Sequence, residues 1–294
     1  MSVSWSHVLQ QGPCIRTLGK VAIAGLLPNR AEEVQTPGPK IDLQVPPRAE
    51  SLLEAYATWS GGANNGYQTT VPPHLFPQWG FPPLANALGR LPWPMTKVLN
   101  QGCRLEVRQP LPKGQALQVS AWLSEVREEA HKVRLTTRIV TGTAEHPECL
   151  VADVFAVVPL AKPKKSGEKK APPVVPEGHR KLSDHTLGPK AGLEFALLTG
   201  DFNPIHWIRP YAKVAGFRSV ILHGFGSMAL AWESIVTHEL NGESGRLKWM
   251  DLRFVRPQFI PGACSVFVDG KGNFAVGKGL GERATTLGTY GVEE

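Results

Sequence analysis

The sequence has few cysteines and no long apolar run, and each absence excludes a class of protein. Its four cysteines lie far apart in 294 residues without a CxxC pair, which argues against a disulfide framework and against a zinc site. The apolar stretch at 21–27 is far shorter than the roughly 18 residues of a membrane-spanning helix. The N-terminus lacks the pattern of a secretory signal, and the C-terminus is not a peroxisomal address. We therefore expect a cytoplasmic protein with reduced thiols, no structural metal and no membrane span.

The formal net charge is +7 and the isoelectric point is about 9.3, which speaks to partners rather than to fold. The sequence contains no zinc-finger spacing, no basic region with heptads and no aromatic RNP-like motif, so we expect no nucleic-acid partner. Part of the positive charge is a lysine cluster at 162–170, which is typical of a solvated linker. The remaining charge would attract an anionic substrate such as coenzyme A or an acidic carrier protein.

The chain is long enough for two domains of ordinary size. The Lys- and Pro-rich stretch 161–177 is expected to be a linker, because it can bury little and its prolines favour extended backbone. We predict a weakly structured N-terminal lead-in at 1–40, a first domain at 41–160 and a second at 178–294.

The two predicted domains resemble diverged copies of one unit. Three pairs of segments match at similar offsets and in the same order: 105–114 with 252–262, 79–88 with 223–232, and 60–64 with 199–203. Each copy shows a helical stretch (49–59 and 190–199), a loop, a second helical stretch and several strands with period-two alternation. This pattern predicts an α+β unit, present twice, in which an antiparallel sheet wraps around a long helix.

The segment 198–206 carries the clearest chemical signal. Gly200 can end a helix with positive φ, and Asn203 with Pro204 favours a turn. Such a turn can bring the carboxylate of Asp201 and the imidazole of His206 to one point. Addition of water to a double bond needs this pair, because one group takes a proton from water while the other delivers one to carbon. The alternative is a capping Asp and an unrelated surface His.

A second segment, 220–228, places glycines at the start of an apolar helical stretch. The N-terminus of a helix presents free N–H groups and a partial positive charge. Gly224 would let this backbone approach a thioester carbonyl and stabilise its enolate-like charge. His223 can also be read as structural, with a ring nitrogen bonded to neighbouring backbone.

Residues 197–228 resemble the signature of the MaoC-like, (R)-specific enoyl-CoA hydratase (hydratase 2) family, whose members adopt the hot-dog fold. The layout with a degenerate first copy is similar to the double-hot-dog members. The resemblance implies that Asp201 and His206 form the acid/base pair, that Asn203 orients their loop and that the Gly224 amide is the oxyanion donor. It also implies an (R)-3-hydroxyacyl product. Ile208 and Trp232 stand where family members often carry polar residues, which leaves substrate shape open.

The first copy is expected to be catalytically silent. Aligned by sequence spacing, it has Gly62 and Tyr67 where the second copy has Asp201 and His206, and neither can do this proton transfer near neutral pH. Its interior would then be free to form an apolar tunnel that holds an acyl tail, or the apolar residues there are ordinary core packing. The residues concerned are Phe76, Trp79, Phe81, Leu84 and Trp93.

The sequence thus predicts reversible hydration of trans-2-enoyl thioesters, with a hot-dog thioesterase or a non-catalytic acyl-thioester binding module as alternatives. No cofactor is expected beyond the coenzyme A or acyl-carrier pantetheine of the substrate. A homodimer is possible. The predicted catalytic residues are Asp201, His206 and Gly224, and the predicted substrate-binding residues are Asn203, His223, Phe225, Trp79 and Phe81.

Overall fold

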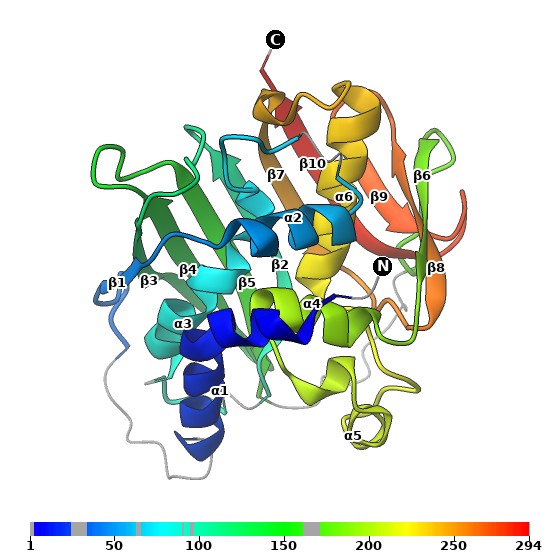
Figure 1. Cartoon of the computed structure of the whole chain (residues 1–294). Coiled ribbons are helices and arrows are strands. Elements are labelled where there is room, and N and C mark those ends of the chain that lie inside the picture. The colour runs from blue at the N-terminus through cyan, green and yellow to red at the C-terminus, as the bar shows by residue number, and fades with distance from the viewer. Residues whose placement is uncertain are drawn as a thin grey trace.

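The computed structural model describes residues 3–24, 34–62, 66–89, 91–94, 97–160 and 171–293. Within these residues ten strands pair antiparallel into a single sheet, and helices cover one face of it (Figure 1). The predicted α+β architecture is therefore confirmed, but the two sheets expected from the repeat are joined edge to edge into one.

The sheet consists of two five-stranded halves with the same strand order. From the outer edge inwards, each half contains its first, third, fourth, fifth and second strand. In the first half these are β1 (Ile41–Val45), β3 (Leu117–Glu129), β4 (Lys132–Gly142), β5 (Leu150–Pro159) and β2 (Leu99–Val107). In the second half they are β6 (Arg180–Leu187), β8 (Gly262–Val268), β9 (Asn273–Gly277), β10 (Ala284–Val292) and β7 (Leu247–Phe254).

The predicted alternation places the expected side chains inside. In β4, Val133, Leu135 and Ile139 are buried while Arg134 is exposed, because successive side chains of a strand point to opposite faces. In β7, Met250 and Leu252 are buried in the same way.

The halves meet where β2 pairs with β7, with Leu105 opposite Met250. Gly102 lies in this seam at a φ of +135°, and a Cβ there would come within 2.0 Å of the Leu252 carbonyl oxygen. Glycine is needed at this point because the two backbones approach too closely for a side chain.

The helices also repeat in order. The first copy has α2 (Glu50–Trp59), the 3-10 turn η2 (Pro73–Leu75) and α3 (Pro77–Leu88). The second has α4 (Ala191–Thr199), η4 (Pro204–His206), the short α5 (Arg209–Val214) and α6 (Gly224–Glu239), followed by η5 (Ser244–Arg246). Both predicted first helices are confirmed to within a residue.

Helix α6 is the long central helix that the pattern predicted. Trp232 and Ile235 are completely buried on it, within a hydrophobic core that also takes in Tyr56 and Leu105 from the first copy. A helix that is apolar on most of its circumference needs such enclosure. The two copies therefore share one core, and α6 holds its N-terminus at a fixed place relative to both.

The N-terminal lead-in differs from the expectation, and the predicted linker is described only in part. The described part of the lead-in contains regular structure: residues 5–24 form η1 (Trp5–Gln11) and α1 (Gly12–Ala24), and Gln11 is fully buried against α4. Within the predicted linker, 161–170 lies outside the described residues, but Val175 is completely buried beside Ala275 and Ala284. Both segments carry apolar or amide side chains that the rest of the fold buries. The domain boundaries themselves stay predictions.

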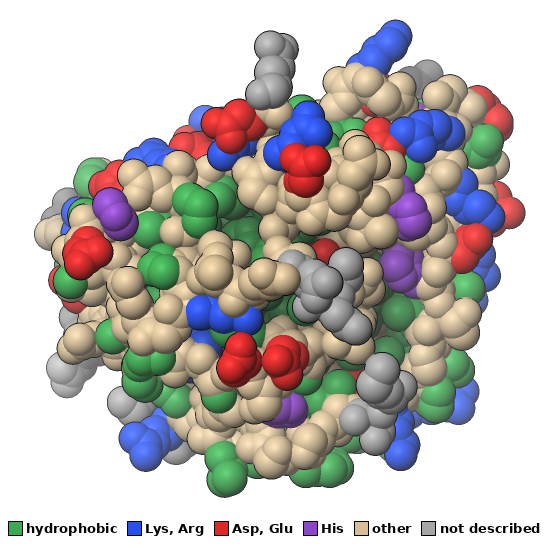
Figure 2. Space-filling view, turned by 45° about the horizontal axis from the view of Figure 1, so that its top comes forward, with side chains coloured by type: hydrophobic (Ala, Val, Ile, Leu, Met, Phe, Trp, Pro, Cys, Tyr) green, Lys and Arg blue, Asp and Glu red, His purple; other side chains and the backbone are tan. Residues whose placement is uncertain are grey.

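None of the described helices combines the length and apolar character needed to cross a membrane. On the face shown in Figure 2, Lys and Arg side chains are interspersed with Asp and Glu. The excess positive charge therefore does not form a single basic field on that face.

Candidate active site

The loop that follows α4 is held by its own side chains. Gly200 ends the helix in the left-handed conformation (φ +82°) and donates its N–H to the Ala196 carbonyl at 2.7 Å. Asp201 Oδ1 accepts from Asn203 N at 3.3 Å, and Asn203 Oδ1 accepts from Ile205 N at 3.3 Å. The chain thus enters η4 through two successive turns, each closed by an Asp or Asn side chain that accepts the backbone N–H two residues further on. The predicted helix end and turn are confirmed, and Asn203 orients the loop.

His206 lies at the end of η4 with a defined tautomer. It is only 7% exposed, and its Nδ1–H donates to the Ile221 carbonyl at 2.9 Å. Since a carbonyl can only accept, the neutral ring carries its proton on Nδ1 and leaves the Nε2 lone pair free. Burial lowers the pKa of His206, opposed by Asp201 and by the bond to Ile221.

His223 precedes α6 and stacks on His206, with ring centroids 3.5 Å apart. Its Nε2–H donates to the backbone carbonyl of Asp201 at 2.9 Å. Burial, followed by the neighbouring His206, holds the pKa of His223 well below its ordinary value. His223 is therefore neutral and fixes the backbone of Asp201, which agrees with the structural reading of this residue.

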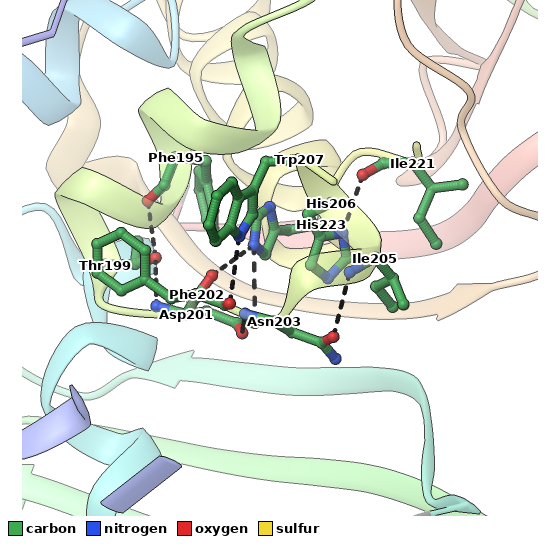
Figure 3. Close-up of polar contacts among 10 residues, drawn as sticks. All are labelled: Phe195, Thr199, Asp201, Phe202, Asn203, Ile205, His206, Trp207, Ile221 and His223. Atoms are coloured by element: carbon green, nitrogen blue, oxygen red, sulfur yellow. Dashed lines mark hydrogen bonds and ion pairs between the residues drawn. The ribbon is translucent and has the colours of Figure 1, made fainter. Parts of the chain in front are cut away.

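Asp201, His206 and His223 come together in one place (Figure 3), each offering a donor or acceptor atom within 4.8 Å of the others. Asp201 Oδ2 lies 3.9 Å from His223 Nε2. The Asp201 side chain is 26% exposed, whereas His206 and His223 are buried, so the carboxylate is the part of this group most open to solvent. A water at the carboxylate would lie within reach of a fixed imidazole.

Among the described residues, these three also form a group that could hold a cation. Nδ1 of His206 and Nε2 of His223 are already committed to backbone carbonyls. The remaining nitrogen of His223 is buried, so a metal ion would have to enter the core to reach it. The donor set suits proton transfer better than metal binding.

Gly224 begins α6 beside this cluster. A Cβ at Gly224 would come within 2.4 Å of the Phe254 ring. The first N–H groups of a helix have no intrahelical partner, so the backbone at Gly224 presents donors where no side chain could fit. Phe225 packs edge-on between Phe76 and Phe254, at 5.5 and 5.9 Å between ring centroids.

The predicted acyl-tail residues are dispersed. Trp79 is buried, donates from Nε1 to Thr141 at 2.9 Å, and lines a cavity of about 420 Å³ between η1, β1 and α3. Phe81 is partly exposed and does not line that cavity. Asp201 and His206 do not line this cavity either. Gln78 does line it, and its backbone carbonyl accepts a hydrogen bond from Cys14, which packs against Gly200.

Alignment by spacing misplaced the first-copy counterpart of His206. By element order η2 corresponds to η4, so Leu75 rather than Tyr67 takes that position. The loop from Ser60 to Pro72 is longer than its equivalent, which shifts the spacing. Sequence reasoning also missed a buried group made by Tyr67, His74 and Glu233, here named the core polar cluster, because Glu233 comes from α6 of the other copy.

Within the core polar cluster His74 Nε2 lies 3.3 Å from Glu233 Oε1, and the His74 ring stacks on Trp232. Burial raises the pKa of Glu233 to about 7, with Tyr67 opposing, and lowers that of His74 to about 3. Burial therefore favours the uncharged form of both side chains.

Fold and site together define a protein of the double-hot-dog type with a carboxylate and an imidazole at a helix N-terminus. A MaoC-like domain model matches residues 173–287, and these residues form a MaoC-like domain. The resemblance seen in the sequence is thereby confirmed.

Two curated proteins share part of the sequence. Mouse peroxisomal multifunctional enzyme type 2 is 26% identical over 171 residues, which are 55% of this chain and 23% of the mouse protein. Peroxisomal enoyl-CoA hydratase 2 of Arabidopsis thaliana is 37% identical over 62 residues, which are 21% of this chain and 20% of the plant protein. The matches thus span a quarter or less of these relatives.

Solved structures share the fold. A MaoC-like dehydratase from Phytophthora capsici superposes with a TM-score of 0.69 at 18% identity, covering 87% of this chain and 96% of that one. A Mycobacterium tuberculosis protein described as a double hot-dog superposes with a TM-score of 0.55 at 13% identity, covering 90% and 98%. The predicted fold class is confirmed.

Proposed function

We propose that this chain catalyses the reversible addition of water to trans-2-enoyl thioesters, giving (R)-3-hydroxyacyl thioesters. The observation that carries the proposal is that a carboxylate oxygen of Asp201 and a ring nitrogen of His206 lie within 4.8 Å of each other, while the Nδ1 proton of His206 is donated to the Ile221 carbonyl. The MaoC-like domain and the hydratase named among its relatives support the same class of reaction.

In the proposed reaction one water adds across the double bond. Its oxygen bonds to C3, and the proton it loses passes through the Asp201/His206 pair while C2 gains a proton. Negative charge that develops on the thioester oxygen is stabilised by the N–H of Gly224 and by the N-terminus of α6. His223 holds Asp201 in place through its backbone carbonyl.

We place the acyl tail toward the first copy. The cavity lined by Trp79 is apolar on most of its surface and is separated from Gly200 by Gln78 and Cys14. The substrate thiol is coenzyme A or carrier pantetheine, and no further cofactor is needed. A cytoplasmic location stays a prediction, as does a homodimer.

The test is loss of the enoyl absorbance of crotonyl-CoA, with longer enoyl-CoAs in parallel, chiral analysis of the product and a thiol reagent in a second cuvette. We expect hydration to the (R)-isomer without thiol release. Thiol release would establish the thioesterase alternative. Saturable binding without conversion at any chain length would establish the binding module and refute the proposal.

Asp201→Asn and His206→Ala assign the chemistry within this assay. Asp42→Asn and His238→Ala serve as matched controls, because Asp42 and His238 are exposed residues on β1 and on the last turn of α6. A pH–rate profile of each variant shows which group acts as the base, since loss of the base removes the acid limb.

A further inference from the structure

Gln11 lies at the end of η1, and both the nitrogen and the oxygen of its side-chain amide form hydrogen bonds. It is 0% exposed. Its Nε2 donates to the carbonyls of Leu197 and Leu198 at 3.0 Å each, and its Oε1 accepts from Gln78 Nε2 at 3.0 Å. The N-terminal segment, dark blue in Figure 1, thus crosses α4 and ties its end to α3.

The two carbonyls are at the last turn of α4, where helix carbonyls have no intrahelical partner. The next residues along the chain are Thr199, Gly200 and Asp201. Gln11 therefore supplies hydrogen-bond donors to the end of α4, directly before the loop that carries Asp201 and His206. In effect it is a C-terminal cap supplied from a distant part of the sequence.

Cys14 holds the same loop from the next turn of the N-terminal segment. A Cβ on Gly200 would come within 2.5 Å of the Cys14 Cβ, and Cys14 Sγ donates to the Gln78 carbonyl at 3.0 Å. Asp201 is close enough to contribute, after burial, to the raised pKa of Cys14. Cys14 therefore packs against Gly200 and lies near Asp201.

We infer that Gln11 is a positioning residue for the Asp201/His206 pair, which makes residues 5–14 part of the active-site scaffold. The inference rests on the proposed function in that Asp201 takes part in catalysis. Without Gln11 two buried carbonyls lose their donors, so the last turn of α4 opens and Asp201 leaves the point that it shares with His206. A displacement of about 1 Å can cost roughly 100-fold in rate.

The first test replaces Gln11 by Leu, with the exposed Gln118 of β3 replaced by Leu as a matched control. We expect kcat for crotonyl-CoA hydration to fall by about 10- to 100-fold with KM within about 3-fold, because positioning acts on the transition state. Amide hydrogen exchange measured by mass spectrometry should rise at 200–206 in Gln11→Leu alone. Wild-type kcat and wild-type exchange in that variant would overturn the inference.

A second variant, Gln11→Glu, decides the matter if Gln11→Leu does not fold. A protonated carboxyl can donate to one of the two carbonyls, whereas a carboxylate repels both. The ratio of variant to wild-type kcat should therefore rise as the pH falls from 8 to 5, and a ratio independent of pH would contradict the inference. If the wild-type protein hydrates no thioester, the proposed function fails, while the exchange at 200–206 still decides the role of Gln11.

Discussion

Two clusters of the molecule each combine a carboxyl group with an imidazole, and we propose that only one of them transfers protons. Around the loop that carries Asp201 and His206, backbone carbonyls fix one nitrogen of His206 and one of His223, and the Asp201 carboxylate reaches solvent. In the core polar cluster Glu233 is 2% exposed, and neither ring nitrogen of His74 has a hydrogen-bond partner. The role proposed for Asp201 and His206 thus agrees with a fixed imidazole tautomer and a carboxylate open to water, and the core polar cluster has neither.

The largest expected difference between the two groups is in turnover. Asp201→Asn and His206→Ala should each lower the hydration rate by about 100-fold or more, since positioned acids and bases contribute that much. Glu233→Gln keeps shape and polarity in the core and should leave the initial rate within about 3-fold of wild type. Initial rates with crotonyl-CoA test the contrast. A folded Glu233→Gln protein as inactive as Asp201→Asn would show that the core polar cluster takes part in the chemistry.

Gly224→Ala, which adds a methyl group at the start of α6, should reduce activity nearly as much as Asp201→Asn or His206→Ala. In Gly224→Ala the new Cβ meets the Phe254 ring, so we expect the ring and the N-terminus of α6 to move apart and the Gly224 N–H to leave its position. Loss of one oxyanion donor typically costs between about 100- and 1,000-fold in kcat, and we expect the lower part of that range. Steady-state kinetics check it. Ser227→Ala in the same helix is the control, and equal kcat values for both variants would remove Gly224 from the oxyanion site.

The core polar cluster should show itself in stability rather than in rate. Burial raises the pKa of Glu233 to about 7 from its ordinary 4.5. The folded state therefore binds a proton that the unfolded state loses between pH 4.5 and 7, so the contribution of Glu233 to stability decreases over that interval and is constant above it. At 1.36 kcal/mol per pH unit the decrease is about 3 kcal/mol. Urea titrations at several pH values should show this slope, and Glu233→Gln should flatten it.

The smallest expected effect is on the pH at which the hydration rate begins to fall. Burial lowers the pKa of His206 below its ordinary 6.5, so its neutral form persists to lower pH. We expect the hydration rate of the wild-type protein to remain constant from pH 8 to about 6.5 and to fall only below that value. Rates in constant-ionic-strength buffers measure this. An acid limb above pH 7 would mean that a group other than His206 governs it.

The sequence predicted what local patterns determine. Period-two alternation identified the strands, and Gly200 with Asn203 and Pro204 identified the loop that carries Asp201 and His206. It could not reveal contacts between distant segments, such as that of Gln11 with α4 or that of Glu233 with His74. Leu75 also could not be matched with His206, because the insertion before η2 changes the spacing without leaving a pattern of its own.

The most direct test of the central claim is a double-mutant cycle on hydration of crotonyl-CoA with Asp201→Asn, His206→Ala and the combined variant. Residues that act as one acid/base unit are strongly non-additive. We predict that the combined variant is no slower than the slower single variant. A combined loss equal to the product of the two single losses would contradict the account, because Asp201 and His206 would then act independently.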